Sequence, residues 1–459
     1  MPRAGPLECM ARHRGRHVRL ERLTHGGTMR LRAILVLAGL SLVAASGGLF
    51  RGASAAEAPA LDGLPPVAAA ADDWPWWRGP NSDNIAAAPQ DPPVKWSATE
   101  NVAWKADVPG RGHGSPCLWG SRIFLAAADD KAQTQSVLCY DRGSGKKLWQ
   151  TEIHRGGFMR QHPKNSHASA TPACDGQYVF MPFMVQGGIW LTAVDFDGKI
   201  AWQKKLGGFE SMHGFAASPA LYKSLVIVVA DHVKGSYIAA LHRRTGEAVW
   251  RIARPDYKLG TYASPAIGRV AGRDQLLIQG PYKVFSYDPA TGKELWTCDG
   301  PNESTCSTVS FSNEFVYASA GFPKRNLLCI RADGDGDVTN THIVWRKDGN
   351  TAYVPALLLV DGLLYMVEDE GKTTCFDAKT GQVIWQTKLG GFFSSSPTLA
   401  GGHIYVANEA GMVYVFKPGR TFELVAQNNL ADGGFATPVI CGGRIYLRTL
   451  KSLYCLAKP

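Results

Sequence analysis

The sequence predicts an all-β protein, an eight-bladed β-propeller with four-stranded blades. Three observations predict it. One strand–turn–strand pattern recurs with a mean spacing of about 46 residues, which is typical of propellers. Most copies contain a glycine turn and end on a tryptophan, and the chain has 13 Trp. The last copy lacks an outer strand, whereas a single strand of that pattern stands alone near the N terminus.

The first 55 residues are predicted to be an upstream extension followed by a secretory signal peptide. An apolar run at 33–45 follows two arginines and is too short to span a bilayer, and the sequence at 53–55 is an A-x-A cleavage site. Either Met1 or Met29 fits as the first residue. We expect an exported chain, periplasmic or secreted, that is soluble after cleavage near Ala55 and has no membrane span.

Charge argues against nucleic acid as a partner. The formal net charge is +10, but residues 1–55 contribute +7 of it, which leaves about +3 for the remainder. Nucleic-acid binding needs a clustered basic face, which this balance does not supply.

Residues 56–92 are expected to form a leader that contains the segment WPWWRGP at 74–80, and residues 93–459 to form the propeller. The strand around Trp104 has the pattern of an outer strand, and the eighth copy ends at Pro459 without one. We therefore expect the N-terminal strand to complete the eighth blade, which leaves no sheet edge open between the ends of the ring.

Two further motifs define each repeat. The turn before the outer strand requires a residue that tolerates positive φ, and it contains Gly145, Gly246, Gly292 or Gly381. The tryptophan in the outer strand offers a large flat surface to the neighbouring blade. The predicted blade-docking residues are Trp104, Trp149, Trp202, Trp250, Trp296, Trp345 and Trp385.

The innermost strands begin with a Ser/Thr-Pro step. The prolines are Pro116, Pro172, Pro219, Pro265, Pro355, Pro397 and Pro438, with Thr308 in the corresponding place of the fifth copy.

These repeats resemble the PQQ-like, or quinoprotein alcohol dehydrogenase-like, propeller family over roughly residues 93–457. The WPWWRGP segment looks like the start of secreted members, and the repeats are distantly similar to the BamB outer-membrane assembly factor. The resemblance implies PQQ and Ca²⁺ as possible ligands. Catalytic relatives hold the quinone under a ring of two adjacent cysteines, and this chain has no Cys-Cys pair. The resemblance therefore favours a scaffold over an enzyme.

Nine cysteines follow residue 55, an odd number for an exported protein. Several occupy the same strand position in different blades, where the geometry holds them apart, so we expect buried free thiols. Cys298 and Cys306 are the one pair that we consider for a bridge.

Two segments are candidates for ligand binding, although no catalytic residue can be assigned. The interval between the first two inner strands carries an insert with several polar residues, and other histidines and a tyrosine precede inner strands elsewhere. The rim candidates are His113, His162, Lys164, Asn165, His167, His213 and Tyr262. Such a rim could bind a metal, an anion or an extended peptide. Asp333, Asp335 and Asp337 resemble the opening of a calcium loop, although Val338 and Val344 break the pattern.

We therefore expect a monomeric, non-catalytic binding or scaffold propeller that presents its rim and channel mouth to a protein or polysaccharide partner of the cell envelope. One alternative is a PQQ-dependent oxidoreductase acting on an alcohol or a sugar. Another is a lyase or hydrolase that uses the histidine-rich rim on a polysaccharide.

Overall fold

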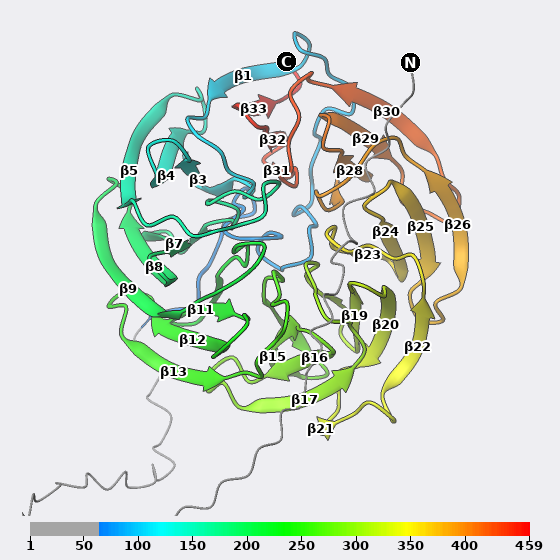
Figure 1. Cartoon of the computed structure of the whole chain (residues 1–459). Helices are drawn as coiled ribbons and strands as arrows, with labels where there is room; N and C mark the ends of the chain where they lie inside the picture. Colours follow the sequence, from blue (N-terminus) through cyan, green and yellow to red (C-terminus); the bar gives the residue numbers. More distant parts are fainter. Residues whose placement is uncertain (1–63) are drawn as a thin grey trace, which may run out of the picture. The chain divides into compact units, whose positions relative to one another are not determined.

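A computed structural model of the chain describes residues 64–459, and the predicted signal peptide lies outside them. Eight sheets follow one another around a ring, and no helix occurs in this part of the chain (Figure 1). This confirms the predicted eight-bladed all-β fold.

The first four blades are sequential from the inner to the outer strand. The first blade consists of β2 (Cys117–Trp119), β3 (Arg122–Asp129), β4 (Thr134–Asp141) and β5 (Lys147–Arg155). The second consists of β6 (Ala173–Cys174), β7 (Tyr178–Val185), β8 (Gly188–Asp195) and β9 (Ile200–Gly208). The third consists of β10 (Ala220–Tyr222), β11 (Leu225–Ala230), β12 (Tyr237–His242) and β13 (Ala248–Ala253). The fourth consists of β14 (Ala266–Val270), β15 (Arg273–Gln279), β16 (Lys283–Tyr287) and β17 (Glu294–Asp299).

The next three blades repeat this order. The fifth consists of β18 (Ser310–Phe311), β19 (Phe315–Ala320), β20 (Asn326–Arg331) and β22 (Ile343–Asp348). The sixth consists of β23 (Leu358–Val360), β24 (Leu363–Val367), β25 (Lys372–Asp377) and β26 (Val383–Lys388). The seventh consists of β27 (Thr398–Ala400), β28 (His403–Ala407), β29 (Met412–Phe416) and β30 (Leu424–Asn429).

The eighth blade joins the two ends of the propeller. It consists of β31 (Val439–Cys441), β32 (Arg444–Arg448), β33 (Ser452–Leu456) and, as its outer strand, β1 (Val102–Asp107). β1 pairs antiparallel with β33, with Trp104 opposite Cys455. The predicted ring closure by the N-terminal strand is therefore confirmed.

A fifth strand covers the outer edge of the fourth blade. β21 (Gly336–Asp337) comes from the long turn of the fifth blade and pairs parallel with β17. Val338, the next residue, is 2% exposed and packs with Trp296 of β17. The turn that resembles a calcium loop is thus an edge strand anchored by an apolar side chain.

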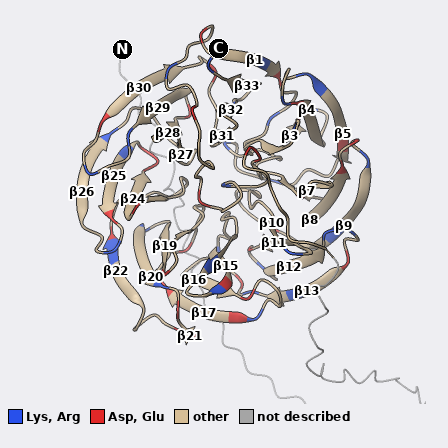
Figure 2. Cartoon of the chain, turned by 180° about the vertical axis from the view of Figure 1, so that it is seen from behind, with Lys and Arg blue, Asp and Glu red and all other residues tan. Residues whose placement is uncertain are grey.

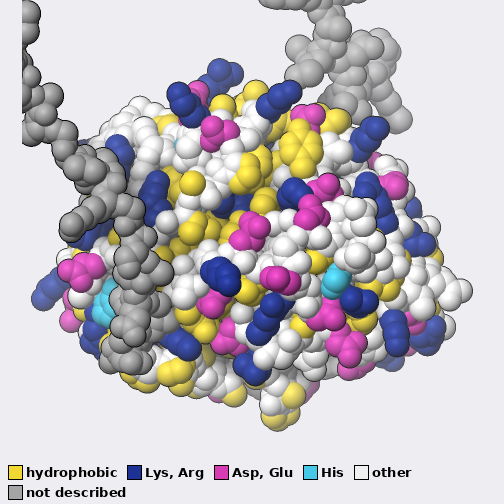
Figure 3. All heavy atoms as spheres, turned by 90° about the horizontal axis from the view of Figure 1, so that it is seen from below, with side chains coloured by type: hydrophobic (Ala, Val, Ile, Leu, Met, Phe, Trp, Pro, Cys, Tyr) yellow, Lys and Arg dark blue, Asp and Glu magenta, His cyan; other side chains and the backbone are white. Residues whose placement is uncertain are grey.

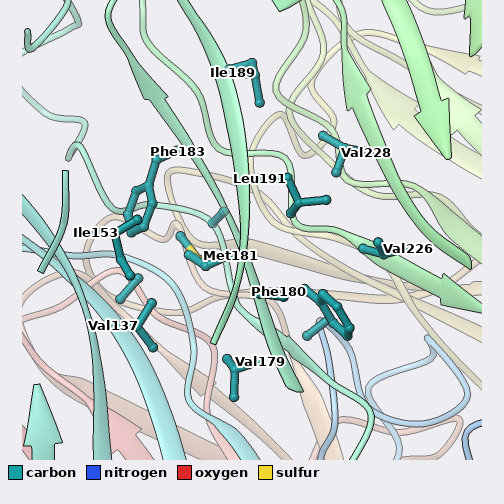
Figure 4. Packing of buried hydrophobic residues seen from close by; sticks show 14 of the residues in the cluster. Val137, Ile153, Val179, Phe180, Met181, Phe183, Ile189, Leu191, Val226 and Val228 are labelled. Atoms are coloured by element: carbon teal, nitrogen blue, oxygen red, sulfur yellow. The ribbon is translucent and has the colours of Figure 1, made fainter. Parts of the chain in front are cut away.

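The hydrophobic core lies between the blades. Both faces of a blade pack against a neighbour, so the middle strands are buried almost throughout instead of alternating. Figure 4 shows this around the second blade, where Phe180 and Leu191 lie between Val137 of β4 and Val226 of β11.

Five of the outer-strand tryptophans pack on the turn glycine of the next blade, namely Trp104, Trp149, Trp202, Trp250 and Trp345. A Cβ on Gly145 would lie 2.5 Å from the ring of Trp104, and one on Gly246 would lie 2.7 Å from Trp202. The glycine therefore provides the positive φ and also the room for the indole. The indole N–H of Trp104 donates to the carbonyl of Arg142 in the same turn, at 3.1 Å.

Trp149, Trp202, Trp345 and Trp385 make the same kind of hydrogen bond to the next blade. Two tryptophans lack this hydrogen bond to the next blade. Trp250 stacks over Gly292, but its buried N–H finds no acceptor. Trp296 is fully buried under β21, and its N–H donates to Gln275 of its own blade at 2.8 Å.

A belt of hydroxyl groups explains the Ser/Thr-Pro step. The backbone N–H of Ser115 donates to Thr171 Oγ1 of the next blade. In the same way the N–H of Thr171 donates to Ser218 Oγ, and the N–H of Ser218 donates to Ser264 Oγ, each at 2.9 Å. On the other side of the ring, Thr437 N donates to Ser115 Oγ at 3.1 Å. The Ser or Thr of the step therefore joins neighbouring blades around the channel.

The belt shows that two positions were misassigned in the sequence. The register of β18 with β19, and of β23 with β24, places Thr308 and Ala356 where the other blades have the Ser/Thr of the step. Val309 and Leu357 consequently take the proline positions. Assigning Pro355 and Thr308 to the proline position is therefore wrong.

The nine cysteines among the described residues are free thiols, eight of them buried. Cys298 lies in the outer strand β17, whereas Cys306 lies in the loop that leads to β18. The bridge considered between them is therefore absent from the structure.

Candidate functional site

The leader crosses one mouth of the channel. Trp74 pairs with Leu118 of β2, and the carbonyl of Pro75 accepts from Cys174 N of β6 at 2.8 Å. Further along, Asn84 Nδ2 donates to the carbonyl of Pro397, just before β27. The blue segment in Figure 1 accordingly runs across the centre of the ring. This mouth is occupied by the protein's own chain.

Arg78 is the deepest polar residue of the leader. Its guanidinium is 1% exposed and donates to the carbonyls of Val309 and Leu357, both at 3.0 Å, and to Ser310 Oγ at 2.9 Å. Burial lowers the pKa of Arg78 to about 10, although Asp83 partly opposes this. One side chain thus joins the fifth and sixth blades at the place where Ala356 leaves the hydroxyl belt without a side-chain oxygen.

The insert between β5 and β6 extends over part of the opposite mouth. Its Lys164 Nζ lies 2.6 Å from Glu409 Oε1, in the turn after β28 of the seventh blade. The same ammonium lies 5.6 Å from the ring centroid of Phe435, in the loop before β31. Figure 1 shows the teal insert extending toward the centre of the ring. Arg111 donates to the carbonyls of Pro163 and Asn165 and holds the insert from below.

Three of the predicted rim residues come together beside the insert. The rings of His162 and His213 lie 5.4 Å apart, and those of His213 and Tyr262 lie 5.7 Å apart, both edge-on. Asn165 Nδ2 donates to the carbonyl of His213 at 2.7 Å. Burial and then the neighbouring His162 lower the pKa of His213, and burial raises the pKa of Tyr262 to about 12. Burial therefore disfavours the charged forms of His213 and Tyr262, which face each other beside His162.

His113 lies on the other side of the insert. Its ring packs on Phe435 with centroids 4.3 Å apart, and its Nδ1 lies 3.5 Å from Ser169 Oγ. Burial, aided by Arg448, Arg111 and Lys164, lowers the pKa of His113 to about 3. Its Nε2 is buried without a partner.

His167 is another rim candidate that the structure places away from the cluster. Its Nδ1 lies 3.0 Å from Asp130 Oδ1, and its Nε2 lies 3.0 Å from the carbonyl of Met159. Its ring also stacks on Phe158 at 3.9 Å. These contacts fix the insert to the first blade.

Sequence reasoning missed Glu409, Phe435 and Arg78. Glu409 is 245 positions from the lysine that it binds. Nothing in the repeat distinguishes its turn from the equivalent turns of other blades. The WPWWRGP segment was a visible signal for Arg78, but its place in the ring was not readable because the segment is not part of a repeat.

The residues present do not fit a Ca²⁺-bound quinone. Asp333 Oδ1 lies 3.2 Å from Arg331 Nε, and Asp337 contacts Lys283 and Thr339. Asp335 lies between them in the loop just before β21. Across residues 64–459, no group of three or more His, Cys, Asp or Glu side chains gathers in a way that could hold a metal ion. We therefore derive no chemical step through PQQ or Ca²⁺.

Charges of both signs are mixed over the surface. Figure 2 shows basic and acidic residues alternating along the outer strands and loops, and Figure 3 shows the same mixture with apolar side chains between them on one side of the molecule. Within the described residues, no helix is long and apolar enough to cross a membrane.

Comparisons with known proteins agree with this fold. Residues 133–343 and 335–421 match the family model described as outer membrane protein assembly factor BamB. The chain is 21% identical over 363 residues to outer membrane protein assembly factor BamB of Yersinia pestis, covering 77% of each chain. It is 24% identical over 395 residues to tetrathionate hydrolase of Acidithiobacillus ferrooxidans, covering 78% of this chain and 70% of that relative.

A solved structure of quinohemoprotein alcohol dehydrogenase from Comamonas testosteroni superposes with a TM-score of 0.61. The two chains share 12% sequence identity, and the match covers 84% of this chain and 81% of the other. At this identity the likeness is one of fold, and the fold is common to proteins with different functions.

Proposed function

We propose, from the premise that this chain belongs to the family of outer membrane protein assembly factor BamB, that it is a non-catalytic scaffold of the cell envelope. In this proposal a protein partner binds at the mouth that the insert crosses. A polysaccharide partner remains the alternative to be tested beside it.

One observation carries the proposal. The insert is held rigidly over the mouth by contacts to the first, third, seventh and eighth blades, yet it leaves His162 and Lys164 exposed. A pre-organised loop loses little conformational freedom when a partner binds. Exposed polar groups beside the partly exposed ring of Phe435 provide hydrogen-bond donors and aromatic surface, the combination that protein interfaces favour.

The test compares variants of residues 56–459 as bait for detergent-solubilised envelope proteins of the source cell. His162→Ala with Lys164→Ala should reduce recovery of a specific partner at least about tenfold, because central polar contacts of an interface carry much of its affinity. Leu148→Ser, on an outer strand far from the mouth, is the control and should recover the partner normally. Equal recovery by all three proteins would refute binding at the mouth.

A second measurement addresses the enzymatic alternative. A ligand at one hundred times its dissociation constant should stabilise the protein by about 2.7 kcal/mol. We expect no change in Tm with PQQ plus Ca²⁺. A rise that requires both would favour a quinone-dependent oxidoreductase and contradict the scaffold.

A further inference from the structure

Exposed apolar side chains gather on one face of the propeller. Six of the large apolar residues that stand out from the surface lie in the loops around the mouth that the insert crosses. They are Met212, Val233, Tyr282, Phe322, Phe392 and Leu450, between 39% and 62% exposed.

Backbone hydrogen bonds fix these residues on the same face. Tyr282 N donates to the carbonyl of Asn302, Phe322 N to that of Ser304, and Leu450 N to that of Gly433. In each case a turn between the two middle strands of a blade is tied to a loop that enters an inner strand, that of the next blade for Tyr282 and that of the same blade for Phe322 and Leu450. Val233 lies in the same kind of turn, whereas Met212 and Phe392 lie in loops that enter inner strands, so all six residues belong to the loops of one mouth.

A lysine follows the apolar residue in four of these turns. The pairs are Val233 with Lys234, Tyr282 with Lys283, Phe322 with Lys324, and Leu450 with Lys451. An apolar or aromatic side chain beside an ammonium group is the combination that settles at a lipid–water interface, where the ring enters the acyl boundary and the ammonium stays among the head groups.

We propose that this face docks reversibly on a lipid bilayer, with the six apolar side chains entering the interface. The arrangement favours a flat lipid surface over a protein partner, because the six residues are spread over the third to the eighth blades. Hot spots for a protein partner cluster near the centre of an interface instead. This inference goes beyond the scaffold proposed above and does not depend on it.

Charge determines which lipid is expected. Glu368, Asp369 and Glu370 lie in the equivalent turn of the sixth blade, and Glu409 in that of the seventh. The lysine of one pair, Lys283, is moreover held by Asp299 and Asp337, so this face has charges of both signs and we expect only weak attraction to anionic lipid. We expect binding to zwitterionic phosphatidylcholine vesicles that persists in sodium chloride on the order of 0.5 M, where interactions between exposed charges are screened.

Vesicle flotation of residues 56–459 tests the proposal. The wild-type protein should float with phosphatidylcholine vesicles, and Phe322→Ser with Phe392→Ser should reduce the bound fraction roughly tenfold, because both rings lose apolar area that would leave water. The matched control, Leu148→Ser with Val344→Ser, removes two side chains that are 42% and 43% exposed on outer strands. The control should float like the wild type.

Each other outcome overturns lipid docking. A wild-type protein that stays in the soluble fraction contradicts it, and so does a control that loses as much binding as the loop variant. Binding that needs anionic lipid and disappears in salt would indicate charge attraction alone. A wild-type dimer that the loop variant dissociates without lipid would show a contact between copies. Partner recovery by the loop variant, measured with the bait assay above, tells lipid docking apart from the scaffold function.

Discussion

A single arginine of the leader joins two blades that the hydroxyl belt does not join. Arg78→Ala removes three charge-assisted hydrogen bonds of 3.0 Å or less. It leaves the buried carbonyl of Val309 without its donor, and the carbonyl of Leu357 with only the Ser310 hydroxyl. We expect a loss of about 3–5 kcal/mol in the free energy of unfolding. Arg78→Lys should lose most of the same amount, because one ammonium cannot reproduce the planar fork.

Chemical denaturation followed by intrinsic fluorescence measures both Arg78 variants against the wild type. Trp77 donates to Thr308 Oγ1 at 2.9 Å and is the neighbouring contact, so Trp77→Phe is the matched comparison and should cost only about 1 kcal/mol. If Arg78→Ala unfolded at the wild-type midpoint, the leader would not stabilise the ring through this residue.

Stability should fall in mild acid because of buried histidines. Burial lowers the pKa of His113 to about 3 and that of His154 to about 4, from an ordinary value of 6.5. The unfolded state therefore binds these protons more tightly than the folded state, and folding free energy is lost as the pH falls from about 6.5 toward these values.

His113→Phe keeps a ring against Phe435 and removes one of these protons. We expect its denaturation midpoint to fall less than that of the wild type between about pH 7 and about pH 4.5. His162→Phe, at an exposed position of the insert, is the control and should follow the wild type. A His113→Phe variant with the full wild-type pH dependence would show that other groups cause the acid sensitivity.

Residues that repeat were predictable, and residues that occur once were not. The tryptophans and turn glycines recur at fixed spacing, so their roles followed from the sequence. The pairing of Lys164 with Glu409 depends on where a unique insert lands on the ring, which no local pattern specifies. The same holds for His167, which the insert directs to Asp130 and away from the other rim histidines.

The turn before each outer strand is a docking element as well as a hairpin turn. Gly145 and Gly187 have nearly the same φ, 72° and 71°, but only Gly145 faces a neighbour. An added Cβ would meet Trp104 at 2.5 Å at Gly145 and nothing within 4 Å at Gly187. Alanine at either position should therefore cost about 1–2 kcal/mol of backbone strain, and only Gly145→Ala should add a packing cost of about 1–3 kcal/mol.

Thermal unfolding of the two alanine variants separates strain from packing. A third variant, Gly145→Ala with Trp104→Ala, tests whether the two sites are coupled: its loss should be smaller than the sum of the single losses, because the clash is gone. Equal Tm values for Gly145→Ala and Gly187→Ala would mean that glycine is required at position 145 only for its positive φ, and not for packing against Trp104.

Elements with unusual neighbours were the ones that the sequence did not predict correctly. The long turn of the fifth blade contains alternating aspartates, which suggested calcium, but Val338 is buried and draws the turn onto β17 as an edge strand. The Ser/Thr-Pro step was misaligned in the fifth and sixth blades for a similar reason. There Val309 and Leu357 take the place of proline, and only the strand register reveals the alignment.

At the scale of the whole molecule, two N-terminal segments close the propeller in different ways. β1 closes the sheet of the eighth blade, whereas the leader spans the channel and contacts inner strands on opposite sides of the ring. A chain that begins at residue 97 lacks the leader but keeps β1. A chain that begins at residue 108 lacks both.

The two truncated chains should therefore differ in stability and in oligomeric state. The chain from residue 97 should remain a cooperatively folding monomer with a lower Tm. Its sheets are complete, but it loses the leader's contacts with the ring, among them the buried contacts of Trp74, Arg78 and Trp96. The chain from residue 108 should associate through the exposed edge of β33, since an unpaired strand edge accepts other strands. Size-exclusion chromatography and thermal unfolding, with residues 56–459 as reference, measure both effects. A monomeric, stable chain from residue 108 would show that the pairing of β1 with β33 is not needed for stability. An unchanged Tm for the chain from residue 97 would show that the leader is not needed.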